Sequence, residues 1–364
     1  MNTISSDFNN SSSAIIFIWI FSLIFLLGII LSIIYIKILR QNIRIKKRKK
    51  RVLKKKFETY LITYLYSEDE NEGNTPEQED ILKKLKKHLN NPFDRKLMVS
   101  SFLKLRNEIS GETVDLIFKL YHQLGLSHYA MNKLKSQKWN IVVEGIRELT
   151  LFQIIEANTA IEVLKNHPKK QINKEVQLYL LNIFNFKGLA FLDNLTTPLS
   201  EWDQIELMEV LNRFDSQDIP DIKPWLKSSN DSVVIFTLKL AKTYIQMEAE
   251  AELLALLQHP NLTVRVKAID VLSYLNVLSA KESLKTKFDT LHEDEQIALM
   301  GMMQNIYETT DVPFIMEHLY HKNFAVKLPL LQILKNIDPE TYSSITTSST
   351  DPEFIKIIKH LENN

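Results

Sequence analysis

The sequence predicts an all-α protein in which a single N-terminal transmembrane helix is followed by a stack of helix pairs. A helical pattern of apolar residues recurs in the second half of the chain, at a period of about 31 residues. Only seven of the 364 residues are Gly, and there are no hairpin dipeptides flanked by alternating apolar residues, so β-structure is not expected. Residues 14–36 form an uncharged apolar run. These three observations define the predicted architecture.

The apolar run at 14–36 is long enough to be a transmembrane helix. At 1.5 Å per residue its 23 residues reach roughly 35 Å, whereas a hydrocarbon core is about 30 Å thick. Trp19 and Tyr35 lie near its two ends, where amphipathic rings favour the membrane interface. A cleaved signal peptide would carry its bases before the run and small residues after it. Here the bases follow the run, which favours a retained anchor.

The basic segment after the apolar run predicts the topology. Residues 37–56 hold twelve Lys and Arg and no acid. The positive-inside rule then places residues 1–13, expected to be a disordered tail, outside the inner (cytoplasmic) membrane and the C-terminal part in the cytoplasm. The basic segment is interpreted either as a topology signal alone or as a contact with anionic lipid heads as well. The candidate lipid-contact residues are Lys46, Lys47, Arg48, Lys49, Lys50 and Arg51.

The rest of the chain is acidic. Residues 57–364 hold 33 basic and 43 acidic residues, so nucleic acid is not an expected partner. A basic juxtamembrane helix is predicted over 37–66, followed by an acidic linker over 67–80. Cysteine is absent, which excludes disulfides and Cys-based metal sites.

Helical spacing resumes at Ile81. The less regular section 81–125 is expected to be an N-terminal helical cap, because terminal units of a repeat array are atypical, and the repeats are expected to span 126–364. The predicted second helices of about seven pairs begin near residues 138, 171, 200, 230, 261, 292 and 323. The candidates for capping the last four are Asn230, Asn261, Glu293 and Asn323.

Alignment at this period predicts which side chains of these last four helices face the core. The predicted core columns are Val233, Val264, Glu295 and Val326; Thr237, Ala268, Leu299 and Leu330; and Leu240, Val271, Met302 and Ile333. Glu295 is the exception among positions that trace one stripe of a helix. A helix pair of this kind cannot bury its apolar face alone, so neighbouring pairs must stack into a solenoid.

One unit carries a family signature. Its residues Leu257, Pro260, Val264, Arg265, Ala268 and Leu272 resemble the HEAT-repeat pattern of a Leu and a Pro followed by Val-Arg-x-x-Ala and further Leu residues. The chain is thus similar to bacterial membrane-anchored HEAT-repeat proteins, which are armadillo-like α-solenoids. Phe288–Met303 lacks the Pro and the Val-Arg pair, and Lys327 replaces the Arg in the last unit. The resemblance implies HEAT-like helix pairs, a scaffold or adaptor role, and an Arg265 that pairs with neighbouring repeats.

No catalytic pattern is found in the sequence. A Gly-rich phosphate loop, a nucleophile elbow and a dinucleotide fingerprint are all lacking. His318 and His321, with Glu317, lack a third firm metal ligand, so neither a metal nor a cofactor is expected. We therefore expect a non-enzymatic scaffold that binds unidentified protein partners through the second helices of the last five pairs. Arg265 and Lys267 are its candidate partner-binding residues.

Two other functions stay open at this point. The first is a non-catalytic subunit of a membrane enzyme or export complex, which would require residues 14–36 themselves rather than any anchor. The second is an enzyme of the chromophore-lyase type, which some bacterial HEAT-like proteins resemble. That function would require a ligand-sized pocket with clustered polar groups.

Overall fold

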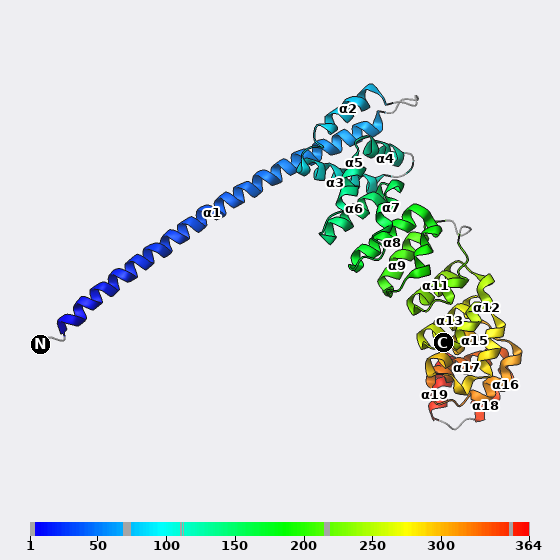
Figure 1. Ribbon diagram of the computed structural model, residues 1–364. Coiled ribbons are helices and arrows are strands. Elements are labelled where there is room, and N and C mark those ends of the chain that lie inside the picture. Colours follow the sequence, from blue (N-terminus) through cyan, green and yellow to red (C-terminus); the bar gives the residue numbers. More distant parts are fainter. Residues whose placement is uncertain are drawn as a thin grey trace. The chain divides into compact units, whose positions relative to one another are not determined.

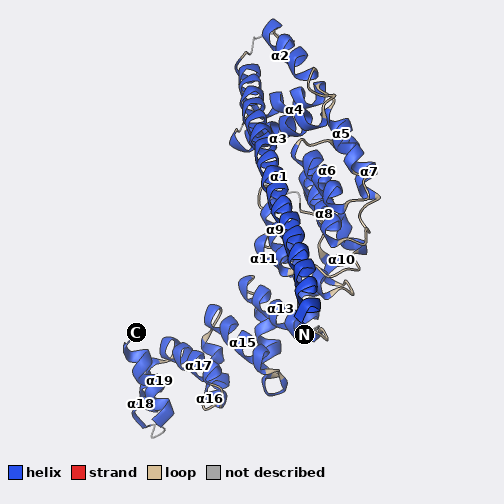
Figure 2. Ribbon diagram, turned by 90° about the vertical axis from the view of Figure 1, so that its left-hand side faces the viewer, coloured by secondary structure: helices blue, strands red, loops and turns tan. Residues whose placement is uncertain are grey.

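The computed structural model of the chain describes residues 4–67, 74–109, 111, 113–214, 219–348 and 352–363. All regular secondary structure in these ranges is helical, as Figure 2 shows. The chain divides into two compact units, Met1–Ile154 and Ile155–Asn364. The predicted all-α fold class is therefore confirmed for the described residues.

The first unit is organised around helix α1 (Ile4–Tyr66), which has 63 residues (Figure 1). The other helices of this unit are α2 (Pro76–Lys86), α3 (Pro92–Glu108), α4 (Thr113–Gln123), α5 (Leu126–Lys133) and α6 (Trp139–Leu151). Helix α1 packs against α2, α3 and α4, and α5 pairs with α6. Phe57, Leu61 and Tyr64, near the C-terminal end of α1, are buried in this unit.

Most of the described part of α1 before these buried residues is exposed and packs on no other helix of its unit. Every side chain from residue 17 to residue 52 is exposed. Among the described helices, α1 is the one that is long and apolar enough to cross a membrane, judged by length and composition. Neither Pro nor Gly occurs between residues 29 and 66, so the basic segment continues the apolar run as one unbroken helix.

The structure differs from the predicted organisation at two places in this unit. Residues 4–13 of the predicted disordered tail are helical, and residues 1–3 lie outside the described ranges. Extending an existing helix needs no new nucleus, which explains the longer helix. The predicted linker 67–80 is shorter, because Thr75 and Gln78 form a capping box that starts α2 at Pro76. Its residues 68–73 lie outside the description.

The second unit alternates short first helices with longer second helices. The second helices are α8 (Lys170–Phe184), α9 (Glu201–Leu211), α11 (Asp231–Thr243), α13 (Leu262–Tyr274), α15 (Glu293–Asn305) and α17 (Phe324–Ile337). The first helices are α7 (Asn158–Glu162), the 3-10 helix η2 (Asn185–Asn194), α10 (Lys223–Leu226), α12 (Glu250–Ala255), α14 (Leu278–Lys285) and α16 (Val312–His318). Helices α18 (Pro339–Ser348) and α19 (Pro352–Asn363) follow α17.

The second helices begin at a nearly constant interval. The N-cap residues of α6, α8, α9, α11, α13, α15 and α17 are at positions 138, 169, 200, 230, 261, 292 and 323. The predicted starts agree with these positions to within two residues. A repeat of this regularity lets each sequence position be followed from one helix to the next.

The predicted core columns are correct. All twelve residues of the three columns are buried, including Glu295. In Figure 1 helices α11, α13, α15 and α17 follow one another side by side, and each packs against the next. One continuous apolar cluster extends through this unit from Leu181 to Ile358. The second unit is thus an α-solenoid of stacked helix pairs.

Asparagine caps fix both the start of a helix and its contact with the preceding repeat. Asn261 accepts the Thr263 amide at 2.8 Å, and its own side-chain amide donates to Asp231 at 2.5 Å. Asn323 donates in the same way to Glu293, at 2.6 Å. The predicted caps Asn230, Asn261 and Asn323 are confirmed.

The predicted cap Glu293 is wrong, because the neighbouring residue His292 caps α15. The Nδ1 atom of His292 accepts the Asp294 amide at 3.2 Å, and Glu295 accepts the His292 amide at 3.1 Å. The reciprocal bonds form a capping box in which an imidazole replaces the usual hydroxyl.

We expect Asn261→Ala to lower the free energy of unfolding by about 1 kcal/mol, because it removes both the cap and the bond to Asp231. Urea unfolding of the full-length protein in mild detergent, followed by circular dichroism, measures the change. Asn261→Asp keeps a capping oxygen but places a second carboxylate beside Asp231, so it should also destabilise. The exposed Asn336→Ala is the control. An Asn261→Ala midpoint equal to that of the control would contradict the double role.

Candidate protein-interaction surface

One column of the repeat is apolar and faces solvent. The fifth residue after the N-cap is apolar in five successive second helices, and we call this column the apolar stripe. It consists of Ile205, Ile235, Val266, Ile297 and Leu328. Ile205 and Ile297 are 52% and 38% exposed, and the other three are half-buried. These side chains therefore contribute less to the core than the columns beside them.

Aromatic side chains extend the stripe at both of its ends. Trp202 lies one turn before Ile205 on α9, and Phe324 lies one turn before Leu328 on α17. Residues three or four apart share a helix face, so each ring adjoins its stripe residue. Trp202 is 64% exposed and Phe324 is 50% exposed. The exposed apolar surface therefore runs from α9 to α17.

Two hollows lie along the stripe, one on each side of α13. The first, of about 410 Å³, is lined by Val266 of α13 and Ile297 of α15. The second, of about 650 Å³, is lined by Ile235 of α11 and by polar residues of the turns before α9 and α11. Thr263 and Lys267 line both hollows, so the hollows adjoin at α13.

Lys267, a predicted partner-binding residue, thus lies on this surface together with a second lysine, Lys239 of α11. Burial lowers the pKa of the Lys239 ammonium, Lys267 lowers it further by repulsion, and Glu201 partly offsets both effects. Neither lysine has an ion pair within the described parts of the chain, whereas Lys242 pairs with Asp270 at 2.7 Å. The two ammonium groups therefore repel each other, and the nearby Glu201 carboxylate offsets this repulsion only in part.

Arg265, the other predicted partner-binding residue, makes its contacts within the solenoid. Its Nε and Nη2 atoms donate to the two carboxylate oxygens of Glu295 at 2.7 and 3.2 Å. Its Nη1 atom donates to the His259 and Pro260 carbonyls at 2.8 and 3.2 Å. This pairing joins α13 to α15. It also explains why Glu295 occupies a core column whose other members are valines. A partner contact by Arg265 stays a prediction, and Lys267 is the more accessible candidate.

The six candidate lipid-contact residues 46–51 lie on the exposed part of α1. Six consecutive residues of a helix cover more than one full turn, so they surround the helix rather than form one face. The Lys49 ammonium is 5.7 Å from the centroid of the Phe93 ring. Along the helix axis the six residues lie roughly 15–22 Å beyond Ile36, the last residue of the apolar run.

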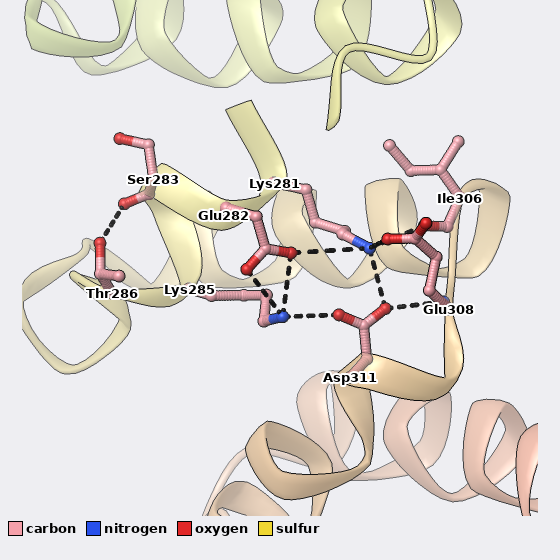
Figure 3. A network of polar contacts seen from close by, with 8 residues as sticks. All are labelled: Lys281, Glu282, Ser283, Lys285, Thr286, Ile306, Glu308 and Asp311. Carbon is pink, nitrogen blue, oxygen red and sulfur yellow. Dashed lines mark hydrogen bonds and ion pairs between the residues drawn. The ribbon is translucent and has the colours of Figure 1, made fainter. Parts of the chain in front are cut away.

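A buried network of charged groups, which the sequence analysis missed, joins two successive first helices (Figure 3). Lys281 of α14 is fully buried, and its ammonium donates to Asp311 at 2.9 Å and to Glu308 at 3.1 Å. Lys285 donates to the other oxygen of Asp311 at 2.6 Å and to Glu282 at 3.0 Å. Each charged group has a partner of opposite sign inside the cluster, so the arrangement fastens α14 to the start of the next repeat.

The histidines singled out in the sequence have structural contacts. The Nδ1 atom of His321 accepts the Asn323 amide at 3.1 Å, and the His318 ring stacks on Phe314. The described residues contain no group of three or more side chains suited to a metal ion.

No known protein family matches this chain, and no curated protein shows significant similarity to its sequence. Solved structures with similar helical repeats include an engineered protein with 15% identity and a TM-score of 0.31, covering 84% of this chain and 88% of the other. A designed armadillo repeat protein in complex with the peptide (KR)4 has 14% identity and a TM-score of 0.25, covering 71% and 99%. The complex of CpcE and CpcF of phycocyanin lyase from Nostoc has 11% identity and a TM-score of 0.24, covering 82% and 98%. At these scores, the chromophore-lyase alternative stays a prediction.

Asp311 allows a test of the buried network through pH. Burial opposes its ionisation, but hydrogen bonds from Lys285, the Glu308 amide and Lys281 outweigh burial and lower its pKa. A carboxyl whose pKa is lowered on folding stabilises the folded state above its unfolded pKa of about 3.9, and this stabilisation is lost as the pH falls through the folded pKa.

We expect Asp311→Asn to lower the free energy of unfolding by about 3 kcal/mol at pH 7, because it leaves buried Lys281 without its main partner. The difference from the unmodified protein should shrink as the pH falls below about 4. Urea titrations of the full-length protein at a series of pH values measure both effects. Asp115→Asn, at an exposed position of α4, is the control. An Asp311→Asn effect that does not depend on pH would contradict the assignment.

Proposed function

We propose that this protein is a membrane-anchored cytoplasmic scaffold that binds protein partners on the apolar stripe. The observation that carries the proposal is the repetition of exposed or half-buried apolar residues in register on five successive second helices. Isolated surface apolar residues are ordinary, whereas a contiguous apolar surface bordered by polar groups is typical of an interaction site. A solenoid presents such a surface over several repeats.

The exposed apolar part of α1 supports anchoring in a membrane. All but Ser22, Gly28 and Ser32 of its described residues from Phe17 to Ile36 have large apolar side chains that are unburied, which is unfavourable in water. The basic segment that follows supports the orientation with the C-terminal part in the cytoplasm. A headgroup layer is roughly 5–8 Å thick, so on a perpendicular helix Lys37 and Arg40 are the bases nearest the lipid. Residues 46–51 would then lie about one Debye length or more from the anionic lipid heads, and would act on them mainly by electrostatic attraction across that distance.

The absence of native cysteine permits a direct test of the topology. We expect a Ser5→Cys variant of the full chain to react with a membrane-impermeant maleimide in intact cells. Ser279→Cys, at an exposed position of α14, should react only after the cytoplasmic membrane is permeabilised. Labelling of Ser279→Cys in intact cells would overturn the orientation, and release of the protein by carbonate without detergent would overturn the anchor.

Site-specific photocrosslinking in living cells tests the partner-binding surface. A photoreactive phenylalanine at Ile205 or Ile297 should give the same crosslinked partner. At Leu278 and Met316, similarly exposed apolar positions on the first helices, it should not. Crosslinks from the first helices alone would move the site away from the stripe, and no reproducible partner at any position would contradict the scaffold.

Replacement of the apolar run separates the scaffold from the alternative of a subunit in a membrane complex. A scaffold should retain its crosslinked partner when residues 14–36 are exchanged for an unrelated transmembrane sequence. A subunit held by contacts within the membrane should lose it.

A further inference from the structure

The spacing of the apolar stripe restricts the conformation of a ligand that lies along it. Helices α11, α13, α15 and α17 pack one against the next and each contributes one stripe residue, and packed helices have axes 8–10 Å apart as a general rule. A ligand in register must therefore present an apolar side chain about every 9 Å on one side.

Three regular conformations can be compared with that requirement. A β-strand presents a side chain on one face about every 6.7 Å, which does not match. An α-helix presents one about every 5.4 Å, so every second turn would lie against a ridge between hollows. A polyproline II segment has three residues per turn and rises about 3.1 Å per residue, which gives about 9.3 Å between side chains on one face. The spacing therefore favours a polyproline II segment.

Charge gives a second, independent restriction. Lys239 and Lys267 lie on neighbouring helices close to Ile235 and Val266, and they repel each other. Other lysines of this part of the solenoid have carboxylate partners: Lys174 pairs with Glu206 at 2.7 Å, and Lys242 pairs with Asp270. A carboxylate from a ligand would give an ion-pair partner to Lys267, which lines the 650 Å³ hollow, and to the neighbouring Lys239.

We propose that the apolar stripe binds a polyproline II segment with an apolar side chain at every third position and a carboxylate placed between Lys239 and Lys267. This inference rests on the proposed scaffold function and specifies the chemistry of the partner. The apolar side chains occupy the hollows between second helices, and the carboxylate fixes the register of the segment along the solenoid. Because a polyproline II segment is ordered before it binds, little conformational entropy is lost on binding.

A synthetic peptide provides the probe. It consists of five Pro-Pro-Leu triplets in which Glu replaces one proline of the central triplet, and it carries fluorescein at one end. Binding to the full-length protein in lipid nanodiscs is followed by fluorescence anisotropy. We expect saturable binding with a dissociation constant below ~100 µM. A peptide of the same composition with leucine at every second position over the same region should bind at least about tenfold more weakly.

Variants of the protein locate the peptide. Ile297→Ser should weaken binding about fivefold through lost apolar contact, whereas Leu278→Ser on α14, which is similarly exposed, should have no effect. Lys267→Glu should weaken binding about tenfold, and a peptide with Lys in place of its Glu should recover most of the loss. The reciprocal exchange is a readout that a general loss of structure would not produce.

Several results would overturn the inference: no saturable binding, equal affinity for the two leucine spacings, or no response to Ile297→Ser and Lys267→Glu. These outcomes are distinguishable from failure of the scaffold. If a cellular partner crosslinks at Ile297 while the peptide does not bind, the scaffold stands and the polyproline II segment is wrong. If neither is observed, both proposals fall.

Discussion

The need of an amphipathic helix pair to bury its apolar face against another pair determines the rest of this structure. A pair exposes too much apolar surface by itself, so each second helix packs on the next at a nearly constant interval along the chain. Once that interval is set, each position of the repeat has a constant environment. The third position after the cap of α11, α13, α15 and α17 is buried, even where Glu295 occupies it, and the fifth is exposed or half-buried, even where it is isoleucine. The core and the apolar stripe are two results of one constraint.

Much of the second unit could be predicted because its determinants are local. Helical periodicity and a fixed repeat length give the core columns, and an Asn in a turn gives the helix start. The cap of α15 was missed because the usual capping residues are Ser, Thr, Asp and Asn, and Glu293 is adjacent to the true cap. An imidazole at His292 performs the same function only when its Nδ1 atom is the acceptor, a property that composition does not indicate.

The contacts between repeats could not be predicted with equal success, because they join residues a whole repeat apart in the sequence. The Lys281–Asp311 pair is an example, although the alignment contained a signal for it. Ala249, Ala280 and Asp311 occupy the same repeat position, and all three are buried. An acid in a column of buried alanines requires a buried cation, and Lys281 directly follows Ala280. The apolar stripe was missed for a different reason, since periodicity alone does not separate a half-exposed isoleucine from a buried one.

The continuity of α1 changes what anchoring would do. A flexible tether raises the effective concentration of a partner by confinement alone. Here the helix that carries the apolar run also supplies Phe57 and Tyr64 to the core of the first unit, with no Pro or Gly between. The 20 residues from 37 to 56 would therefore hold that unit about 30 Å from the end of the apolar run. A stiff arm restricts both the height and the tilt of whatever it carries. The arm raises the effective concentration of partners on the same membrane that lie at a matching distance from the bilayer. It does not do so for partners that lie flat on the lipid surface.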